Sequence, residues 1–455
     1  MSERYITADR DQMSLLPYDL RDWIPEDDFV HFVIEAVENI SLDKFKTNAI
    51  GTGSKQYHPH QMLSLLIYSY ANGVFGSRRI ERATYRDIAV RYLCANTHPD
   101  HDTICKFRRD NFAAVSEAFL YVLKLARELK LLQVGTISVD GTKIKANASK
   151  NKSIRYDRAK ELEQQLTTDI KELMEKAERA DAEQENDSQK LPEEVCRRQK
   201  LREKMAKARQ ILEGQAQDRA KQQQVDYEEK LSERQQRKDQ RGKHPQPPSA
   251  KPLDTEQVNL TDVDSRLMRR NRHSEYQQAY NAQAAVDADG SQLILGVVVS
   301  QSAGDHGLLA VDVLSVPRQI GTPKRVLADN GYASENEVEA VEKDNIEVLV
   351  SVHSEAKQAQ RRYDFRPSQI VKVKEKKEGP YVKEWVKRMA DKMNTAEAQK
   401  QYRFRKQTVE PVFGIIKQAM GFRQFLLRGA AKVAGEWSLV ATAYNFRRLY
   451  VLKTA

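Results

Sequence analysis

The sequence predicts a mixed α/β protein. A mixed β-sheet with flanking helices is expected to follow an all-helical N-terminal region and to be interrupted by a helical-hairpin insertion. Apolar residues recur at helical spacing up to about residue 133, and strand-like and helical patterns alternate on both sides of a long interruption. The interruption is rich in Glu, Gln, Lys, Arg and Ala and ends in a Pro-rich stretch. We therefore expect four segments, residues 1–133, 134–155, 156–256 and 257–455.

The N-terminal region shows a series of helical patterns. Residues 27–40 carry an apolar stripe at helical spacing. Residues 59–74 begin with Pro59 and end near Gly73, which are common first and last residues of a helix. A further helix is predicted over residues 77–94.

The last N-terminal pattern, residues 100–132, predicts one long helix that Asp102 or Thr103 can cap. Basic residues near the helix starts favour a helix-turn-helix-like DNA-binding domain, although a plain helical bundle fits nearly as well. These residues are Arg78, Arg79, Lys106, Arg108 and Arg109.

After residue 133 the spacing of the apolar residues changes from helical to alternating. Residues 134–149 alternate at Ile137 and Val139 and again around Ile144, which predicts a strand, a tight turn at Asp140-Gly141 and a second short strand.

Residues 156–240 contain two arms with apolar residues at three- and four-residue steps, which predicts an antiparallel helical hairpin. A disordered charged linker is the alternative. Pro192 suits the start of the second helix, and the stretch 243–252 with its four prolines predicts a stiff linker. The apolar residues of the two arms are Leu162, Leu166, Ile170, Leu173 and Ala177, then Leu201, Met205, Ala208 and Leu212.

After the linker, two strands around Asp289-Gly290 predict a β-hairpin. A short helix over 307–316 and a buried strand that ends at Asp329 follow. Another helix over 335–345 and another buried strand over 346–352 complete the sheet. The last hundred residues are expected to be mostly helical.

Charge is distributed unevenly along the chain. The net charge is +10, but residues 355–455 contain 23 Lys and Arg against 9 Asp and Glu, a net charge of +14. A basic C-terminal quarter on a nearly neutral body favours a polyanionic partner such as nucleic acid, although charge runs are usually solvated surface.

With no apolar run of about 18 residues and no signal-peptide core, a cytoplasmic protein without membrane contact is expected. The three cysteines form neither a metal-ligand pair nor a disulfide framework.

Asp140 and Asp329 each follow a predicted strand. In open α/β sheets, sites gather at the carboxyl ends of strands, and two carboxylates there can hold a pair of divalent cations. Oxygen ligands favour two Mg²⁺ or Mn²⁺ ions. The alternative is ordinary turn chemistry, since Asp-Gly and Asp-Asn-Gly are common in turns.

Glu410 is a third candidate. Lys417 lies seven residues on, two turns along the same face of an α-helix, and Pro411 suggests that a helix starts beside Glu410. Basic and aromatic side chains precede it, namely Tyr402, Arg403, Arg405 and Lys406. The alternative is an exposed glutamate in the first turn of a helix.

Four other residues are weaker candidates. Asp305 follows a strand and could be a metal ligand. Trp385 could stack on a displaced base, although core packing is the more common role of tryptophan. Asp262 and Asp264 form an isolated Asp-x-Asp pattern that is typical of a turn.

Together these stretches identify a family resemblance. The chain resembles the bacterial insertion-sequence transposases of the DDE type, in particular the group numbered eleven eighty-two, over nearly its whole length. The most specific N-terminal stretches are HPHQMLSLLIYSYANGVFGSRRIERA and DHDTICKFRRDN. VDGTKIKANAS is similar to the first-Asp motif of the family, VLADNGYAS to the second, and YRFRKQTVEPVFGIIK to its tyrosine–arginine–glutamate–lysine signature.

The resemblance implies a ribonuclease-H-like core in which Asp140, Asp329 and Glu410 form the catalytic, metal-binding triad. It implies that Tyr402 and Lys417 contact the phosphates of the transposon ends, and that no covalent protein–DNA intermediate forms. The signature has Arg four residues before the Glu, and here that position is Lys406, with Arg405 beside it. Either of the two could contact DNA.

We therefore expect a transposase. It would bind the terminal inverted repeats of its element, cleave DNA by two-metal hydrolysis and join the 3′-hydroxyl ends to target DNA. Its expected partners are double-stranded DNA at the nucleoid and a second copy in the synaptic complex. In this scheme residues 1–133 bind DNA, residues 134–155 and 257–455 build the catalytic core, and 156–256 are the insertion. The alternatives are an inactive DNA-binding regulator, a nuclease without strand transfer, and a coiled-coil adaptor.

Overall fold

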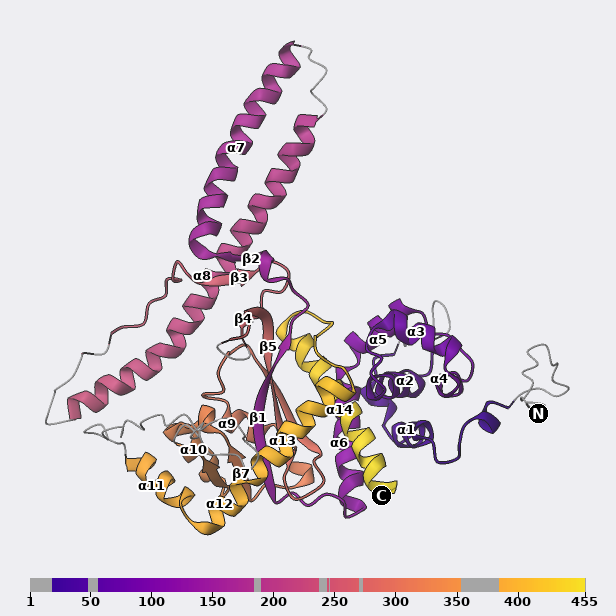
Figure 1. The fold of residues 1–455 in the computed structure, drawn as a ribbon. Helices are drawn as coiled ribbons and strands as arrows, with labels where there is room; N and C mark the ends of the chain where they lie inside the picture. Colours follow the sequence, from indigo (N-terminus) through magenta and orange to yellow (C-terminus); the bar gives the residue numbers. More distant parts are fainter. Residues whose placement is uncertain are drawn as a thin grey trace, which may run out of the picture.

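The computed structural model describes residues 19–47, 56–183, 190–236, 244, 246–269, 273–352 and 384–454. A six-stranded mixed sheet lies at its centre (Figure 1). The strands are β1 (Thr136–Lys145), β4 (Arg266–Met268), β5 (Gln277–Asp287), β6 (Ile294–Ser300), β7 (Arg325–Ala328) and β8 (Glu347–Val350).

The strand directions agree with the predicted mixed sheet. β5 pairs antiparallel with β1 along one edge, and with β4 and then β6 along the other. On the far side of β1, β7 and β8 are parallel to β1 and to each other. Three antiparallel strands followed by two parallel ones are consistent with the ribonuclease-H-like core that the resemblance implies.

β1 differs from the prediction of a strand, a turn and a second strand. It is one continuous ten-residue strand, and its pairing with β5 runs unbroken through Asp140↔Ala284 and Gly141↔Gln283. The Asp-Gly pair is therefore in a strand, and Asp140 lies in the middle of β1. Gly141 has a spatial role instead, since a Cβ there would overlap the side chain of Gln283.

The described N-terminal region is helical, as predicted. Asp100, rather than Asp102 or Thr103, caps α5, because its carboxylate accepts the N–H of Thr103 at 2.7 Å. The predicted long helix is two helices, which are separated at Asn111. The elements are η1 (Leu20–Trp23), α1 (Phe29–Glu38), η2 (Leu42–Lys44), α2 (Pro59–Ala71), α3 (Ser77–Arg86), α4 (Ile88–Leu93), α5 (His101–Asp110) and α6 (Phe112–Glu128).

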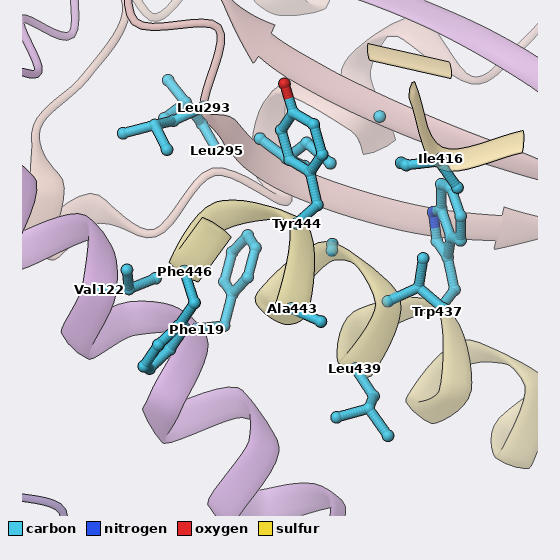
Figure 2. Close-up of a cluster of buried hydrophobic side chains, with 14 of the residues drawn as sticks. Phe119, Val122, Leu293, Leu295, Ile416, Trp437, Leu439, Ala443, Tyr444 and Phe446 are labelled. Atoms are coloured by element: carbon cyan, nitrogen blue, oxygen red, sulfur yellow. The ribbon is translucent and has the colours of Figure 1, made fainter. Parts of the chain in front are cut away.

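The C-terminal helix α14 (Ala430–Thr454) joins the N-terminal helices to the sheet. It packs against α2, α6 and β6, and its buried side chains belong to the same hydrophobic cluster as those of the N-terminal helices and of β1. Figure 2 groups Phe119 and Val122 of α6 with Phe446 of α14, and Trp437 with Ile416. Burying such aromatic side chains is a large part of core stability.

The insertion forms the predicted antiparallel hairpin. α7 (Tyr156–Glu183) and α8 (Lys190–Gln236) pack against each other and project from the sheet (Figure 1). A small ladder between β2 (Ser153–Arg155) and β3 (Gln257–Asn259) joins the hairpin to the core. The seam buries Leu166, Met205 and Leu212, but Leu201, which was expected in it, is 42% exposed. Ion pairs flank the seam, for example Arg209 with Glu163 at 2.9 Å.

The remaining elements surround the sheet. α9 (Leu309–Leu314) and α10 (Glu335–Glu342) are as predicted. The others are η3 (Lys150–Lys152), η4 (Arg318–Ile320), η5 (Asn330–Tyr332), α11 (Glu384–Met393), α12 (Ala396–Tyr402), α13 (Phe404–Gly414) and the π-helical turn η6 (Ile415–Ala419). No helix within the described ranges is long and apolar enough to cross a membrane.

Pro411 lies inside α13, and the prediction that a helix starts beside it is wrong. A proline in a helix leaves the carbonyl four residues earlier without its N–H donor. Here that carbonyl belongs to Gln407, and it accepts a hydrogen bond from Gln292 Nε2 at 3.0 Å. This bond compensates for the missing donor, and the helix continues.

Candidate active site

Asp140 lies in β1, and Asp329 directly follows the end of the neighbouring strand β7. β1 and β7 pair in parallel register through Ile137↔Val326 and Ser138↔Leu327. Asp140 and Asp329 each come two residues after the last of these pairs, and the charge of Asp329 acts on Asp140. That the two acids share one site stays a prediction.

The edge of β1 is open at this point. β7 ends at Ala328, and the next pairing on that side of β1 is a single parallel bridge between Lys145 and Gln424. Between the two, the described structure has no strand against β1. We call the gap in the sheet that contains Asp140 and Gly141 the notch.

The negative charges of Asp140 and Asp329 repel each other at the notch. Burial, and next the negative charge of Asp329, raise the pKa of Asp140 to about 7, while the N–H of Gly141 and the charge of Arg405 oppose the rise. The Gly141 N–H donates to Asp140 Oδ1 at 2.8 Å, and the Gly331 N–H donates to Asp329 Oδ1 at 2.7 Å. Repulsion between adjacent carboxylates would be relieved by a cation or a proton between them.

Glu410, the third predicted acid, is an exposed residue of α13. That helix packs against β1 and β5. Among the described residues, no three His, Cys, Asp or Glu side chains are arranged so that they could hold a metal ion. The convergence of Glu410 with the two aspartates therefore stays a prediction.

Arg405 and Lys406 occupy different environments. Arg405 is 6% exposed and its charge acts on Asp140, whereas Lys406 is exposed. The Arg405 guanidinium lies 5.7 Å from the ring centre of Tyr402, whose hydroxyl donates to the carbonyl of Ala328 at 3.2 Å. Tyr402 and Arg405 thus lie against the strand end that precedes Asp329. Arg403 is exposed.

Lys417 lies in the π-helical turn, so the spacing of two regular α-turns from Glu410 does not apply. Its ammonium donates to Thr142 Oγ1 and, at 3.3 Å, to the carbonyl of Lys143. Thr142 is on the same face of β1 as Asp140, because alternate residues of a strand share a face. Lys417 is therefore close to the notch.

The N-terminal basic residues divide into two groups. Arg78, Arg79, Lys106 and Arg109 are exposed. Arg108 is only 4% exposed, and its guanidinium donates to Tyr70 Oη at 2.8 Å and to the carbonyl of Phe75 at 3.2 Å. The prediction that Arg108 contacts DNA is wrong, because its polar atoms are directed into the protein.

The weaker candidates have structural contacts. Asp262 accepts the hydroxyl of Tyr280 at 2.9 Å, and Asp264 accepts the N–H of Ala430, the first residue of α14, at 2.9 Å. The Asp-x-Asp pattern therefore holds α14 in place. Trp385 is partly buried beside α10. Asp305, by contrast, acts on Asp140 through its charge.

Comparison with known families identifies two matches. A transposase DDE domain model matches residues 257–446, and a second transposase domain model matches residues 18–110. The first match begins after the insertion and includes Asp329 and Glu410, whereas Asp140 lies before it. No curated protein and no solved structure matches the chain. The two matched regions together cover most of the N-terminal helices and most of the sheet, and the chain belongs to the DDE-type transposases of insertion sequences.

Proposed function

We propose that this transposase binds the terminal inverted repeats of an insertion sequence, hydrolyses a phosphodiester bond at each end and transfers the freed 3′-hydroxyl to target DNA. The observation that carries the proposal is the position of Asp140 in β1 and of Asp329 directly after the neighbouring strand β7, with the charge of Asp329 acting on Asp140. Both chemical steps are in-line displacements at phosphorus, so one site can serve both. Synapsis of two ends further suggests a dimer, bound to DNA in the nucleoid.

The residues at the notch fit divalent cations. Carboxylate oxygens are ligands for Mg²⁺ and Mn²⁺, and the notch has one carboxylate in β1 and one directly after β7. We propose Asp140, Asp329 and Glu410 as the residues that would hold two such ions. When bound, two cations would activate the attacking oxygen and stabilise the leaving oxygen.

The basic residues divide by their exposure. Exposed Arg403 and Lys406, with Lys417 beside the notch, are proposed to bind phosphates of the transposon end. The inward Arg405 is proposed to position Asp140 through its charge rather than to contact DNA. Phosphate contacts fix register without reading sequence. The exposed N-terminal residues Arg78, Arg79, Lys106 and Arg109 are proposed to bind DNA further from the notch.

Cleavage and joining assays with the purified protein test this function. The substrates are DNA that contains the repeats flanking its own gene, a target plasmid, and Mg²⁺. Asp140→Asn and Asp329→Asn should each abolish cleavage and leave end binding within about twofold, because they remove metal-binding charge rather than phosphate contacts. Asp344→Asn, at an exposed acid beyond α10, is the matched control.

The outcomes separate the alternatives. Binding without cleavage by the wild type would identify an inactive regulator. Cleavage without joining would identify a nuclease. Loss of all activity, including DNA binding, on deletion of residues 156–240 would support the adaptor.

A further inference from the structure

The helix α3 in the N-terminal region has an exposed face made of basic and aromatic side chains. At about 100° per residue, its exposed residues lie within an arc of about 120° around the helix. The buried residues Ile80 and Thr84 lie on the opposite side. The exposed residues of α3 are Arg78, Arg79, Arg82, Tyr85 and Arg86.

The other described helices from α1 to α6 have no such face. Within their bounds α2 and α4 have no exposed residue, and the exposed side chains of α1 are Glu35 and Glu38. On α6, exposed Lys124 and Arg127 are accompanied by exposed Glu128. Because DNA phosphates attract bases and repel acids, α3 is better suited to enter a groove of DNA than its neighbours are.

α5, which packs against α3, is the nearest competitor for this role. Its exposed side chains are two bases, Lys106 and Arg109, and two acids, Asp102 and Asp110. The exposed charges of α5 therefore cancel, whereas those of α3 add.

α3 is held firmly by its neighbours. Its one acid, Glu81, lies outside the exposed arc and is 3.0 Å from Nδ1 of His101 on α5. A single residue, Asp87, separates α3 from α4, and its carboxylate accepts the N–H of Val90 at 3.0 Å. Figure 1 shows α3 at the edge of the N-terminal helices, away from α1. A firmly packed helix keeps its side chains at fixed spacing for recognition.

Tyr85 is fixed at one side of the basic face. It is 57% exposed, and its ring stacks on the imidazole of His98 with ring centres 3.8 Å apart and planes 13° apart. His98 Nδ1 lies 3.1 Å from Thr84 Oγ1, which holds the imidazole against α3. The stack orients Tyr85 before any partner binds, and a tyrosine hydroxyl is a common donor to DNA phosphates.

The dimensions of α3 fit the major groove. An α-helix with its side chains is about 10–12 Å wide, and the major groove is about 12 Å wide. Arg78, Arg82 and Arg86 are four residues apart and form one row along the centre of the exposed arc. The fork of an arginine matches the two acceptors of guanine, O6 and N7. Arg79 and Tyr85 lie on the two sides of this row.

We propose that α3 is the helix that reads the sequence of the terminal repeat. Arg78, Arg82 and Arg86 contact guanine edges in the major groove, and Arg79 and Tyr85 contact phosphates on either side. Lys106 of α5 adds a phosphate contact. This inference rests on the proposed function, because the DNA that α3 reads is the transposon end, and it identifies the residues that give preference for that end.

Binding of the full chain to DNA without Mg²⁺ tests the inference apart from cleavage. The probes are the repeat that flanks its own gene and a scrambled duplex of equal length and composition, followed by fluorescence anisotropy at several salt concentrations. Arg82→Ala should lower the preference for the repeat about 5–150-fold, as expected for loss of one bidentate guanine contact. Arg79→Ala should weaken binding to both duplexes equally and reduce the salt dependence by about one ion.

Lys124→Ala, at an exposed lysine of α6, is the charge-matched control and should keep the wild-type preference. Since all three substituted side chains are exposed, the variants should unfold as the wild type does.

Methylation of guanine N7 in the repeat gives a second measurement, because it blocks the acceptor that a bidentate arginine needs. Methylation of particular guanines should prevent binding of the wild type, and Arg82→Ala should become insensitive to methylation of one of them.

The outcomes separate this inference from the proposed function. If the wild type prefers and cleaves the repeat while Arg78→Ala, Arg82→Ala and Arg86→Ala all keep that preference, the inference about α3 is overturned and the proposed function stands. Loss of the preference in Lys106→Ala instead would identify α5 as the reading helix and also overturn the inference. If the wild type neither prefers the repeat nor cleaves it, both are overturned.

Discussion

Replacing Arg108 with methionine should destabilise the protein and leave DNA binding almost unchanged. The guanidinium bonds to Tyr70 Oη, and Tyr70 is 3.4 Å from Glu436 Oε1. Glu436 is fully buried, and its other oxygen accepts the N–H groups of Leu426 and Leu427 at 2.9 and 3.0 Å. Methionine keeps the apolar stem and removes the charge, so the effect is electrostatic.

The size of the expected loss in unfolding free energy depends on the buried carboxyl of Glu436. Burial raises the pKa of this carboxyl, while the Leu427 N–H and the charge of Arg108 oppose the rise. Without the charge of Arg108, the pKa of the buried Glu436 carboxyl should rise further, and the buried polar network loses its cation. The free energy of unfolding should therefore fall by about 3–5 kcal/mol, as for other broken buried pairs.

The same reasoning gives a pH dependence with a definite sign. In the variant, the pKa of Glu436 is higher in the folded state than in the unfolded state, so the folded state binds more protons. Stability then rises as the pH falls toward the unfolded pKa. The loss of stability in Arg108→Met should therefore be smaller at pH 5 than at pH 7.

Urea unfolding at both pH values and salt titrations of DNA binding measure these effects. Arg109→Met is the control, because Arg109 is the exposed neighbour. It should change the unfolding free energy by less than about 0.5 kcal/mol and lower the salt slope by about one ion. Wild-type stability in Arg108→Met, together with a salt slope reduced by one, would refute the reasoning and place Arg108 on DNA.

Three further results are expected. Lys417→Ala should weaken binding to specific and unrelated DNA alike, reduce the salt dependence of binding by about one ion and lower cleavage. If the binding constants of variant and wild type fall in parallel with salt concentration and cleavage is unchanged, Lys417 does not contact a phosphate. Gly141→Ala should lower the free energy of unfolding by about 1–3 kcal/mol and also reduce cleavage, because the added Cβ overlaps the side chains of Gln283 and Asp305. A variant as stable and active as the wild type would show that these side chains move away without cost. In labelling with a thiol reagent at pH 8, exposed Cys196 should react at once and Cys94 only after unfolding, because burial raises the pKa of Cys94 to about 12. Rapid reaction of Cys94 in the folded protein would be evidence against this packing.

Local signals predicted much of the fold. The Asp289-Gly290 hairpin, the strand before Asp329 and the two insertion helices follow from turn residues and hydrophobic period, which act over a few neighbours. The motifs of Asp140 and Asp329 come near each other because β1 and β7 pair in register, and a metal site shared by the two acids stays a prediction.

The predictions that were wrong depended on contacts between segments that are distant in the sequence. Asp140-Gly141 has the composition of a turn, yet the glycine is needed because Asp305 and Gln283, far along the chain, occupy the space beside it. Pro411 stays in its helix because Gln292 bonds to the carbonyl it leaves without a donor. Arg108 lies four residues after buried Ile104, on the inner face of α5, and Tyr70 accepts its hydrogen bond, whereas Arg109 is exposed. The helical spacing from Ile104 is the local signal that could have identified Arg108 as buried, and the partners of Gly141 and Pro411 lie far along the chain.

The packing of α14 against α2 and α6 has a consequence for synthesis of the chain. The partner that covers the apolar faces of these early helices is made last. At bacterial rates of about 5–20 residues per second, more than 300 residues must be added before that cover exists, a delay of roughly 20–80 s. Until then the nascent chain exposes apolar surface of the kind that chaperones bind. A ribosome that stops before residue 430 releases a product whose first helices lack their cover, so complete translation is a condition for a stable N-terminal region.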